Sequence, residues 1–521
     1  MSLTVAPSVQ DAFAHAPRRA AWDRAIDAGV ALLCVMPLLL TAHLPLTDLP
    51  NHLARQYILR DWASSPWFQQ FYDIHWALVP NLALELFVLG ARQVMSIDLA
   101  IRVFCIVTML LLLAGTRFVN RLLGGPDARS YRAVPLLCYG GPFQYGFVSY
   151  CFGVGLALVL FGLYLRVRRR DWAWLAVLMP LSFVLLLCHL AAFGLFAIAV
   201  GGCELTCAWQ SVCRPRSIRR LAAAAVRYQA KPLLMLVPVF LVFALFSPTA
   251  DDSAVSAVTR FSTLHEKARG FAAITLFAAP RLEASLLILA LAGLAIALFT
   301  RTLRLHAIAA TGAAVMLLAW LALPLIALGG AYIDYRLPWA VSFFVLAGLL
   351  PGARHPAFGR ATGCYVGALA VARILIISWL WLRWEPTLAA IDAALSQVPH
   401  GTRLMVVEAA LPGGFRDPDL EHVAAYAVAR SQSFEPGMFA SLTGQILYFQ
   451  PHYMDLADQA NFDVAIPSRL DELPPDYTYI LDLLPELTRI GPMLPTACEA
   501  SGPQFRLLRR LPPGSIPVPC P

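Results

Sequence analysis

A carboxylate, an imidazole and a guanidinium follow the first apolar run of the chain within a few residues: Asp48, His52 and Arg55. Pro50 keeps the preceding helix from simply continuing, which holds Asp48 at a turn, and His52 and Arg55 would share one face of the next helix. A carboxylate there can act as a base on a hydroxyl or amine, and an arginine or protonated histidine can hold a phosphate. Asp48 is therefore the candidate catalytic residue. The alternative is an ordinary polar loop in which Asp48 and Asn51 are cap and turn residues.

Other polar side chains stand at the ends of later apolar runs. His189 lies inside a long apolar block, where a lone histidine is more often packed or capping than catalytic. Asp334 and Arg336 open a late run and could simply pair with each other, and Tyr145 flanks a short turn. The candidate substrate-binding residues are His52, Arg55, Tyr145, His189, Tyr332, Asp334 and Arg336.

Signals for other chemistries are missing from the sequence. It contains no glycine-rich phosphate loop, CxxC pair or HExxH motif. Cys203, Cys207 and Cys213 have no matching histidine cluster, which favours a structural role. Arg102 and Arg373 fall within apolar runs and must face protein or a wet cavity. For Arg373 we expect a structural partner.

Composition identifies the environment of the chain. Its 521 residues are 59% hydrophobic and 14% charged, against about 25% charged in soluble proteins, and the mean hydropathy is +0.65. These values exclude a cytosolic enzyme, a disordered chain and a small disulfide scaffold. The net charge of +8 comes from arginines in short loops between apolar runs, as membrane topology requires, so no nucleic-acid partner is expected.

The apolar runs predict about eleven membrane spans, since a bilayer needs roughly 20 residues per helix. They are 25–43, 99–117, 133–147, 149–166, 172–188, 190–208, 232–247, 283–300, 306–328, 337–350 and 361–381. The alternation of arginine-rich loops places the N-terminus in the cytoplasm and the C-terminus outside. Two long outer loops, 44–98 and 248–282, then face outward, with surface helices expected over 78–95 and Gly270–Pro280.

The long apolar runs of the sequence end at about Arg383. A helix is expected over Glu385–Val398, and strands over Leu404–Val407, Tyr477–Leu481 and Phe505–Leu508. The chain is therefore divided into an all-α polytopic membrane bundle over 1–383 and a small extracytoplasmic α/β domain over 384–521.

Two cysteines, Cys498 and Cys520, are the only ones in this C-terminal part. In an oxidising compartment they would form a disulfide that contributes on the order of 3 kcal/mol by closing a loop of about twenty residues. The alternative is two unpaired thiols near a fraying terminus.

This arrangement resembles the GT-C superfamily of integral-membrane glycosyltransferases, which includes protein O-mannosyltransferases and aminoarabinose transferases. The resemblance rests on the acid of Thr47-Asp48-Leu49-Pro50-Asn51-His52 after the first span, and on aromatic surface helices over 62–95. It also rests on His189 between the fifth and sixth spans and on Arg336 near the outer start of a late span.

The resemblance implies a polyprenyl-phosphate sugar donor and an inverting transfer to a glycan, lipid or protein acceptor, in contact with membrane lipid. Asp48 would be the base, and His189, Arg336 and Arg55 would hold the leaving phosphate. Many relatives carry a second acid in the outer turn between spans three and four, where this chain has 141–147 and no acid. We therefore expect no cofactor, although Asp48, His52 and His189 are residue types that also bind divalent metals.

The expected location is the inner (plasma) membrane, with the C-terminal domain in the periplasm capping the cavity. Two alternatives belong to other classes: a transporter or flippase of a lipid-linked intermediate, and a non-enzymatic membrane scaffold. The transferase hypothesis requires Asp48, His52, His189 and Arg336 to converge in one outward pocket.

Overall fold

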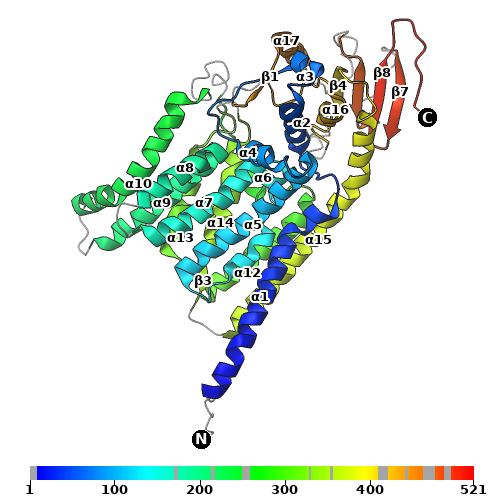
Figure 1. The fold of residues 1–521 in the computed structure, drawn as a ribbon. Helices are drawn as coiled ribbons and strands as arrows, with labels where there is room; N and C mark the ends of the chain where they lie inside the picture. The colour runs from blue at the N-terminus through cyan, green and yellow to red at the C-terminus, as the bar shows by residue number, and fades with distance from the viewer. Residues whose placement is uncertain are drawn as a thin grey trace.

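Long apolar helices packed side by side form most of the molecule, with a smaller part rich in strands at one end (Figure 1). The computed structural model describes residues 9–168, 174–212, 218–248, 259–327, 330–352, 356–408, 420–440, 444–460, 476–485 and 495–520. The bundle contains α1 (Val9–Leu40), α5 (Ile97–Gly124), α7 (Val148–Val167), α8 (Leu175–Cys188), α9 (Leu190–Ser211), α10 (Ile218–Phe246), α12 (Pro280–Phe299), α13 (Ala307–Ala322), α14 (Ile333–Gly348) and α15 (Pro356–Leu395).

Helix length and composition indicate an integral membrane protein. Within the described ranges, six helices are long and apolar enough to cross a bilayer: α5, α7, α9, α10, α12 and residues 359–395 of α15. The helices α8 and α13 are apolar but shorter. Because a hydrocarbon core of about 30 Å needs roughly 20 residues, these helices account for most of the predicted apolar runs.

One predicted span is not observed as a helix, and one predicted helix is the end of a longer one. Residues 133–147 do not cross the bundle but form a 3-10 helix, η1 (Ser130–Leu136), and the short α6 (Gly141–Gln144). The sequence Gly140-Gly141-Pro142 interrupts regular helix there. The separate helix expected over Glu385–Val398 is instead the continuation of α15, which passes through Pro386. The predicted domain boundary at 383 therefore lies inside a helix.

Buried ion pairs explain how the apolar helices accommodate charge. Arg373 of α15 contacts Glu283 of α12 at 3.2 Å and donates to the carbonyls of Tyr139 and Thr275 at 2.9 Å each, which confirms the expected structural partner. The guanidinium of Arg102 donates to backbone carbonyls at the end of α1.

The segment after α1 is predicted to face outward, and we call it the first outer segment and the corresponding stretch around 248–282 the second. The first outer segment forms α2 (Leu49–Asp61), α3 (Pro66–Phe71), β1 (Tyr72–Ile74) and α4 (Ala83–Ala91). The surface helix expected over 78–95 is thus shorter than predicted. In the second outer segment the helix is α11 (Leu264–Ala272), not Gly270–Pro280. A capping box between Thr263 and Glu266 starts α11, a local signal that fixes the beginning of a helix.

The C-terminal part contains a four-stranded sheet in the order β4-β6-β8-β7. Its strands are β4 (Leu404–Glu408), β6 (Tyr479–Leu483), β7 (Thr496–Gly502) and β8 (Phe505–Arg510). β4 runs parallel to β6, and the other neighbours are antiparallel. Strands predicted near β4, β6 and β8 are observed, whereas β7, with the sequence TACEASG, has too few β-branched residues to be predicted.

The disulfide prediction is confirmed, since Cys498 and Cys520 are bonded with their Cα atoms 5.0 Å apart. Two helices, α16 (Ala425–Ser431) and α17 (Pro451–Ala460), and the strand β5 (Leu447–Phe449) complete this part. At the opposite end of the bundle, β2 (Leu303–Leu305) pairs with β3 (Leu349–Pro351).

The C-terminal part is joined to the membrane bundle at several places. β5 pairs antiparallel with β1 of the first outer segment. His43, just after α1, contacts Glu385 at 3.0 Å and Asp392 at 3.1 Å, both on α15. Arg430 of α16 in turn contacts Asp392 at 3.0 Å. The loop between α1 and α2 is therefore fixed to both α15 and the C-terminal part.

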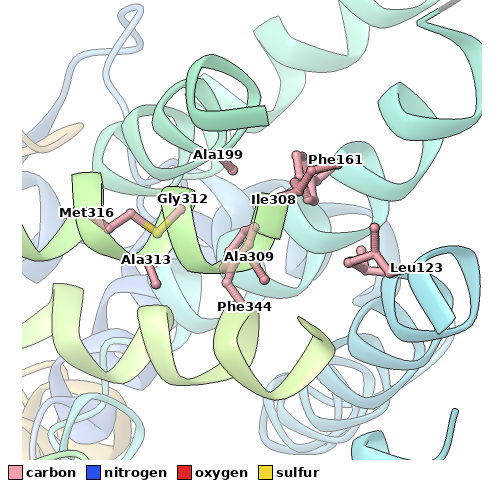
Figure 2. A pocket seen from close by; sticks show the side chains of 10 residues that line it. Leu123, Phe161, Ala199, Ile308, Ala309, Gly312, Ala313, Met316 and Phe344 are labelled. Atoms are coloured by element: carbon pink, nitrogen blue, oxygen red, sulfur yellow. The ribbon is translucent and has the colours of Figure 1, made fainter. Parts of the chain in front are cut away.

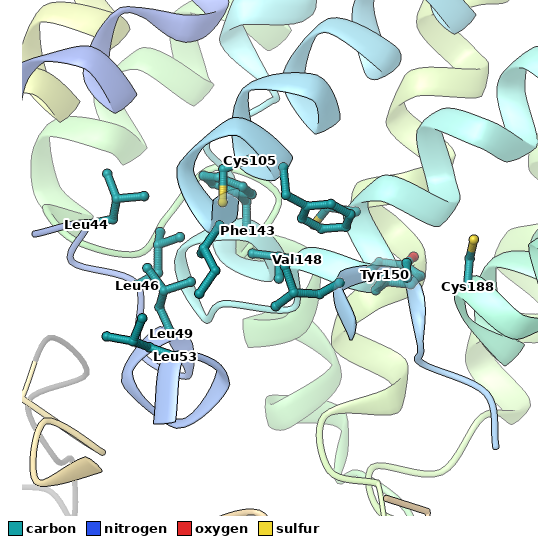
Figure 3. Packing of buried hydrophobic residues seen from close by; sticks show 14 of the residues in the cluster. Leu44, Leu46, Leu49, Leu53, Cys105, Phe143, Val148, Tyr150 and Cys188 are labelled. Carbon is teal, nitrogen blue, oxygen red and sulfur yellow. The ribbon is translucent and has the colours of Figure 1, made fainter. Parts of the chain in front are cut away.

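A buried apolar cluster supports this loop from below. Leu46, Leu49 and Leu53 belong to the same buried cluster as Phe143 and Val148 (Figure 3). Burial of such side chains typically contributes 1.5–3 kcal/mol each. This packing holds the start of α2, and with it the residue that precedes α2, against the segment 141–148.

Candidate active site

Asp48 lies in the loop between α1 and α2, directly before the first residue of α2. Its backbone N–H donates to the carbonyl of Tyr145 at 3.0 Å, and Thr47 N–H donates to the carbonyl of Gln144 at 3.1 Å. The side chain of Asp48 makes no hydrogen bond to the helix it precedes. Asp48 is thus the N-cap residue of α2 by position, but its side chain does not cap the helix, and the carboxylate is available for other contacts.

The close approach of two loops requires a glycine at position 146. Gly146 has φ +89°, and a Cβ there would lie 2.8 Å from the backbone nitrogen of Asp48 and 2.9 Å from its Cβ. Only glycine adopts this conformation without strain and leaves room for the neighbouring chain. The turn after α6 thus sets the position of the Asp48 carboxylate.

The surroundings of Asp48 favour its protonated form. Its side chain is 15% exposed, and His422 Nε2 lies 3.7 Å from Asp48 Oδ1. Burial, followed by the charge of Glu421, raises the pKa of Asp48 to about 8, against the opposing charges of Arg336 and Arg55. A carboxyl group with a pKa near neutrality is poised to accept and release a proton.

Arg336 and His189 meet near this carboxylate. Arg336 Nη1 lies 3.2 Å from His189 Nε2, and its guanidinium lies 4.2 Å from the centre of the Phe147 ring. His189 caps α9, with Nδ1 accepting the N–H of Ala191 at 3.1 Å, so we assign the proton of the neutral ring to Nε2. The N–H groups of Arg336 Nη1 and His189 Nε2 are then both donors with no acceptor between them. An anion that lies beside the two groups would accept a hydrogen bond from each.

The guanidinium of Arg336 forms no ion pair with a described residue. Within the described ranges, no carboxylate lies within 4 Å of its guanidinium, and its Nε is buried with no hydrogen-bond acceptor. The alternative in which Asp334 and Arg336 simply pair with each other is not observed. Asp334 is fully buried and contacts Lys267 at 2.9 Å and Ser262 at 2.6 Å, because α11 supplies a nearer cation.

Arg55 is also engaged elsewhere. Its guanidinium forms a buried ion pair with Glu85 of α4, donates to Gln445, and contacts His52 Nδ1 at 3.0 Å. Burial and the charge of Arg55 lower the pKa of His52 to about 3. These surroundings favour the neutral form of His52, and its role in substrate binding stays a prediction.

Aromatic rings form one wall beside Asp48. Tyr145 stacks on Tyr332 with ring centres 5.2 Å apart and also contacts Phe147 at 5.5 Å. Tyr332 has φ +55° and is 39% exposed. Exposed stacked rings of this kind offer an apolar face on which a sugar ring can pack.

The structure thus brings together most of the predicted residues. Asp48, His52 and Tyr145 are joined by direct contacts, and Arg336 with His189 and Tyr332 lies alongside. The sequence analysis missed Glu85, Glu421 and His422. A lone acid in an otherwise apolar surface helix was a usable signal for Glu85, whereas no local pattern distinguishes Glu421 or His422.

A separate small pocket lies deep between α5, α7, α9, α13 and α14 (Figure 2). It is lined by apolar side chains such as Leu123, Phe161, Met316 and Phe344. It lacks a charged group that could bind phosphate. In the part of the chain that the structure describes, no group of three or more His, Cys, Asp or Glu side chains is arranged to hold a metal ion. Metal-independent chemistry remains a prediction.

The sequence matches no protein-family model and no curated protein. The structure matches the crystal structure of ArnT from Cupriavidus metallidurans bound to undecaprenyl phosphate, with TM-score 0.53, 11% sequence identity, and coverage of 96% of this chain and 99% of that chain. The chain has the fold of ArnT. The apo structure of ArnT gives TM-score 0.52 and 12% identity over 94% of this chain and 98% of that one. At this identity the likeness concerns the fold alone, and it agrees with the polytopic membrane fold predicted from the sequence.

Proposed function

We propose that this protein is an inverting glycosyltransferase that moves a sugar from a polyprenyl-phosphate donor to an acceptor on the outer side of the membrane. The observation that carries the proposal is a mostly buried carboxylate, Asp48, near an arginine, Arg336, that has no carboxylate within 4 Å in the described part of the chain. The ArnT fold, crystallised in one case with undecaprenyl phosphate, supports a lipid phosphate as the ligand of that arginine.

The donor phosphate would be held by Arg336 and His189. Their facing N–H groups, 3.2 Å apart between Nη1 and Nε2, would each donate to a phosphate oxygen, and charge-assisted hydrogen bonds of this kind are about twice as strong as neutral ones. Holding the phosphate there stabilises the negative charge that develops as it leaves. Arg55 and Asp334, predicted as substrate-binding residues, are assigned a structural part because both are held in buried ion pairs.

Asp48 would remove the proton of the acceptor. A lone pair of the acceptor oxygen or nitrogen forms the new bond to the anomeric carbon as the bond to the phosphate oxygen breaks, and its electron pair leaves with the polyprenyl phosphate. The acceptor proton passes to the carboxylate. A phosphate leaving group needs no general acid, so one carboxylate suffices.

Sugar and acceptor would lie against the aromatic wall and under the C-terminal part. Tyr145 and Tyr332 supply stacked rings next to the backbone that holds Asp48. The C-terminal part lies at the same end of the bundle (Figure 1). With the N-terminus in the cytoplasm, as the arginine distribution predicts, this end faces outward, which in a bacterial inner membrane is the periplasm.

Two measurements on the purified full chain in nanodiscs test the proposal. Binding of undecaprenyl phosphate should weaken about 10- to 100-fold in Arg336→Ala, the loss expected for charge-assisted hydrogen bonds. Transfer from a panel of undecaprenyl-phosphate sugars should fall about 10²- to 10⁴-fold in Asp48→Asn with binding retained. Arg92→Ala and Asp73→Asn, in the same outer segment, are the matched controls.

Full transfer by Asp48→Asn would refute the base assignment. A transporter or flippase would instead show no transfer by the wild type and movement of the labelled lipid between leaflets. A scaffold would show neither binding nor transfer.

A further inference from the structure

The segment 420–424 brings a histidine from the C-terminal part into contact with Asp48. His422 Nε2 lies 3.7 Å from Asp48 Oδ1, and the side chains are 20% and 15% exposed. The two residues come from distant parts of the sequence, so this contact exists only in the complete fold. It is the contact by which the C-terminal part reaches the proposed base directly.

The backbone at His422 is held in an unfavourable conformation. Its φ is +66°, a left-handed value that non-glycine residues adopt at some cost and that is concentrated at functional sites. The ring packs edge-on against Phe439, with centres 5.0 Å apart, and Phe439 also contacts His52 at 6.1 Å. The surrounding side chains therefore hold the imidazole in one orientation toward Asp48.

The segment that contains Phe439 is itself anchored to α2. The side-chain amide of Asn51 accepts the N–H of Phe439 at 3.1 Å and donates to the carbonyl of Gly437 at 3.2 Å. Asn51 thus both accepts a hydrogen bond from the backbone of the C-terminal part and donates one to it. Because Asn51 lies three residues after Asp48, this anchor fixes the distance between carboxylate and imidazole.

We propose that His422 and Asp48 form a proton-sharing pair, in which His422 Nε2 takes up the proton that Asp48 removes from the acceptor. His422 is then a positioning residue that acts through Asp48, and the inference rests on the proposed transferase function. The acceptor proton moves to Asp48 Oδ1, then to His422 Nε2, and finally to water or to the released phosphate monoester.

The charged groups around Asp48 explain why a proton acceptor is useful. The segment 420–424 contributes Glu421 and His422, α2 contributes His52 and Arg55, and α14 contributes Arg336. Burial and Glu421 raise the pKa of the Asp48 carboxyl to about 8, so a proton that Asp48 takes from the acceptor leaves it slowly near pH 7. Passage of that proton from Asp48 to the neutral His422 returns the carboxylate to its ionised form, and His422 then releases the proton to water or to the departing phosphate.

The test is the pH dependence of transfer by the full chain, measured as kcat/KM. His422→Asn is the first variant, because asparagine tolerates a left-handed backbone better than most residues. We expect its rate to fall about tenfold near pH 7 and to recover to within about threefold of wild type near pH 9, where Asp48 ionises unaided. His75→Gln, an exposed histidine of the first outer segment, should leave the profile unchanged.

A merely structural role for His422 would lower the rate by the same factor at every pH, and that result would overturn the proposal. If His422→Asn fails to fold, as judged by its melting temperature, His422→Gly, which accepts φ +66° without strain, replaces it under the same criterion. A wild-type protein that does not transfer sugar refutes the proposed function. Normal transfer with an unshifted profile in the variant refutes only the proton-sharing pair.

Discussion

Replacing Asp48 by asparagine should inactivate the protein and at the same time stabilise it in a pH-dependent way. The pKa of Asp48 is raised from its ordinary value of 3.8 to about 8 by burial and by Glu421. Between these two pH values the folded chain keeps a proton that the unfolded chain has released. Folding stability is therefore lost as the pH rises through this window, whether Asp48 or His422 carries the proton.

The magnitude follows from the pKa difference. Each pH unit within the window costs the wild type up to about 1.4 kcal/mol of unfolding free energy. Asp48→Asn has no such proton to hold, so the gap between variant and wild type should widen by on the order of 4 kcal/mol from about pH 5 to about pH 8. With the unfolding entropy typical of globular proteins, this corresponds to roughly 4 °C in melting temperature for a chain of this size.

A thiol-reactive dye can follow the unfolding, because the buried cysteines, such as Cys34, Cys105 and Cys151, become reactive only when the bundle opens. The melting temperatures of wild type, Asp48→Asn and the exposed control Asp73→Asn are compared from about pH 5 to about pH 9. We expect the gap for Asp48→Asn to grow up to about pH 8 and then to remain constant, and no gap for the control. A gap that does not change with pH, or a variant that melts below the wild type at about pH 8, would refute the assigned environment of Asp48.

Three further predictions concern the framework of the site. Glu85→Gln should lower the unfolding free energy by about 3–5 kcal/mol because it leaves the buried charge of Arg55 unpaired, and a hydrophobic replacement of both residues should lose less; thermal unfolding of the wild type and of these two variants measures this. Cys498→Ser should cost about 2–4 kcal/mol by opening the C-terminal loop, a loss that a reducing agent should reproduce in the wild type. Gly146→Ala should cost about 1–3 kcal/mol and reduce transfer, since a methyl group would displace Asp48; equal transfer in this variant would contradict the close contact.

Sequence patterns predicted the parts of the fold that depend on local periodicity. Long apolar helices, the strand at Leu404, and the turn at His189 follow from residues that are neighbours in the chain. The proximity of Asp48 to Arg336 was predicted only through a resemblance to a family, because nothing local brings the two together. The charge balance of the site could not be predicted, since Glu85 neutralises Arg55 across a tertiary contact.

The incorrect predictions have the same origin. Pro386 was expected to mark the start of a new helix, but contacts of Glu385 and Asp392 with His43 stabilise a continuous α15. Tertiary contacts of this kind outweigh a local propensity against helix. The contact of His422 with Asp48 could not be predicted for the same reason, because it depends on how the C-terminal part packs against the loop after α1.

The contacts that join the C-terminal part to the loop after α1 also have a consequence for biosynthesis. Asp48 is among the first residues to leave the ribosome, whereas His422 and the β5 strand that pairs with β1 are among the last. At about 5–20 residues per second, synthesis leaves on the order of tens of seconds between them. During that time the nascent chain already has α1 in the membrane but lacks a finished site. Under the proposed function, transfer begins only after the segments that contain His422 and β5 have been synthesised and have packed against the loop after α1.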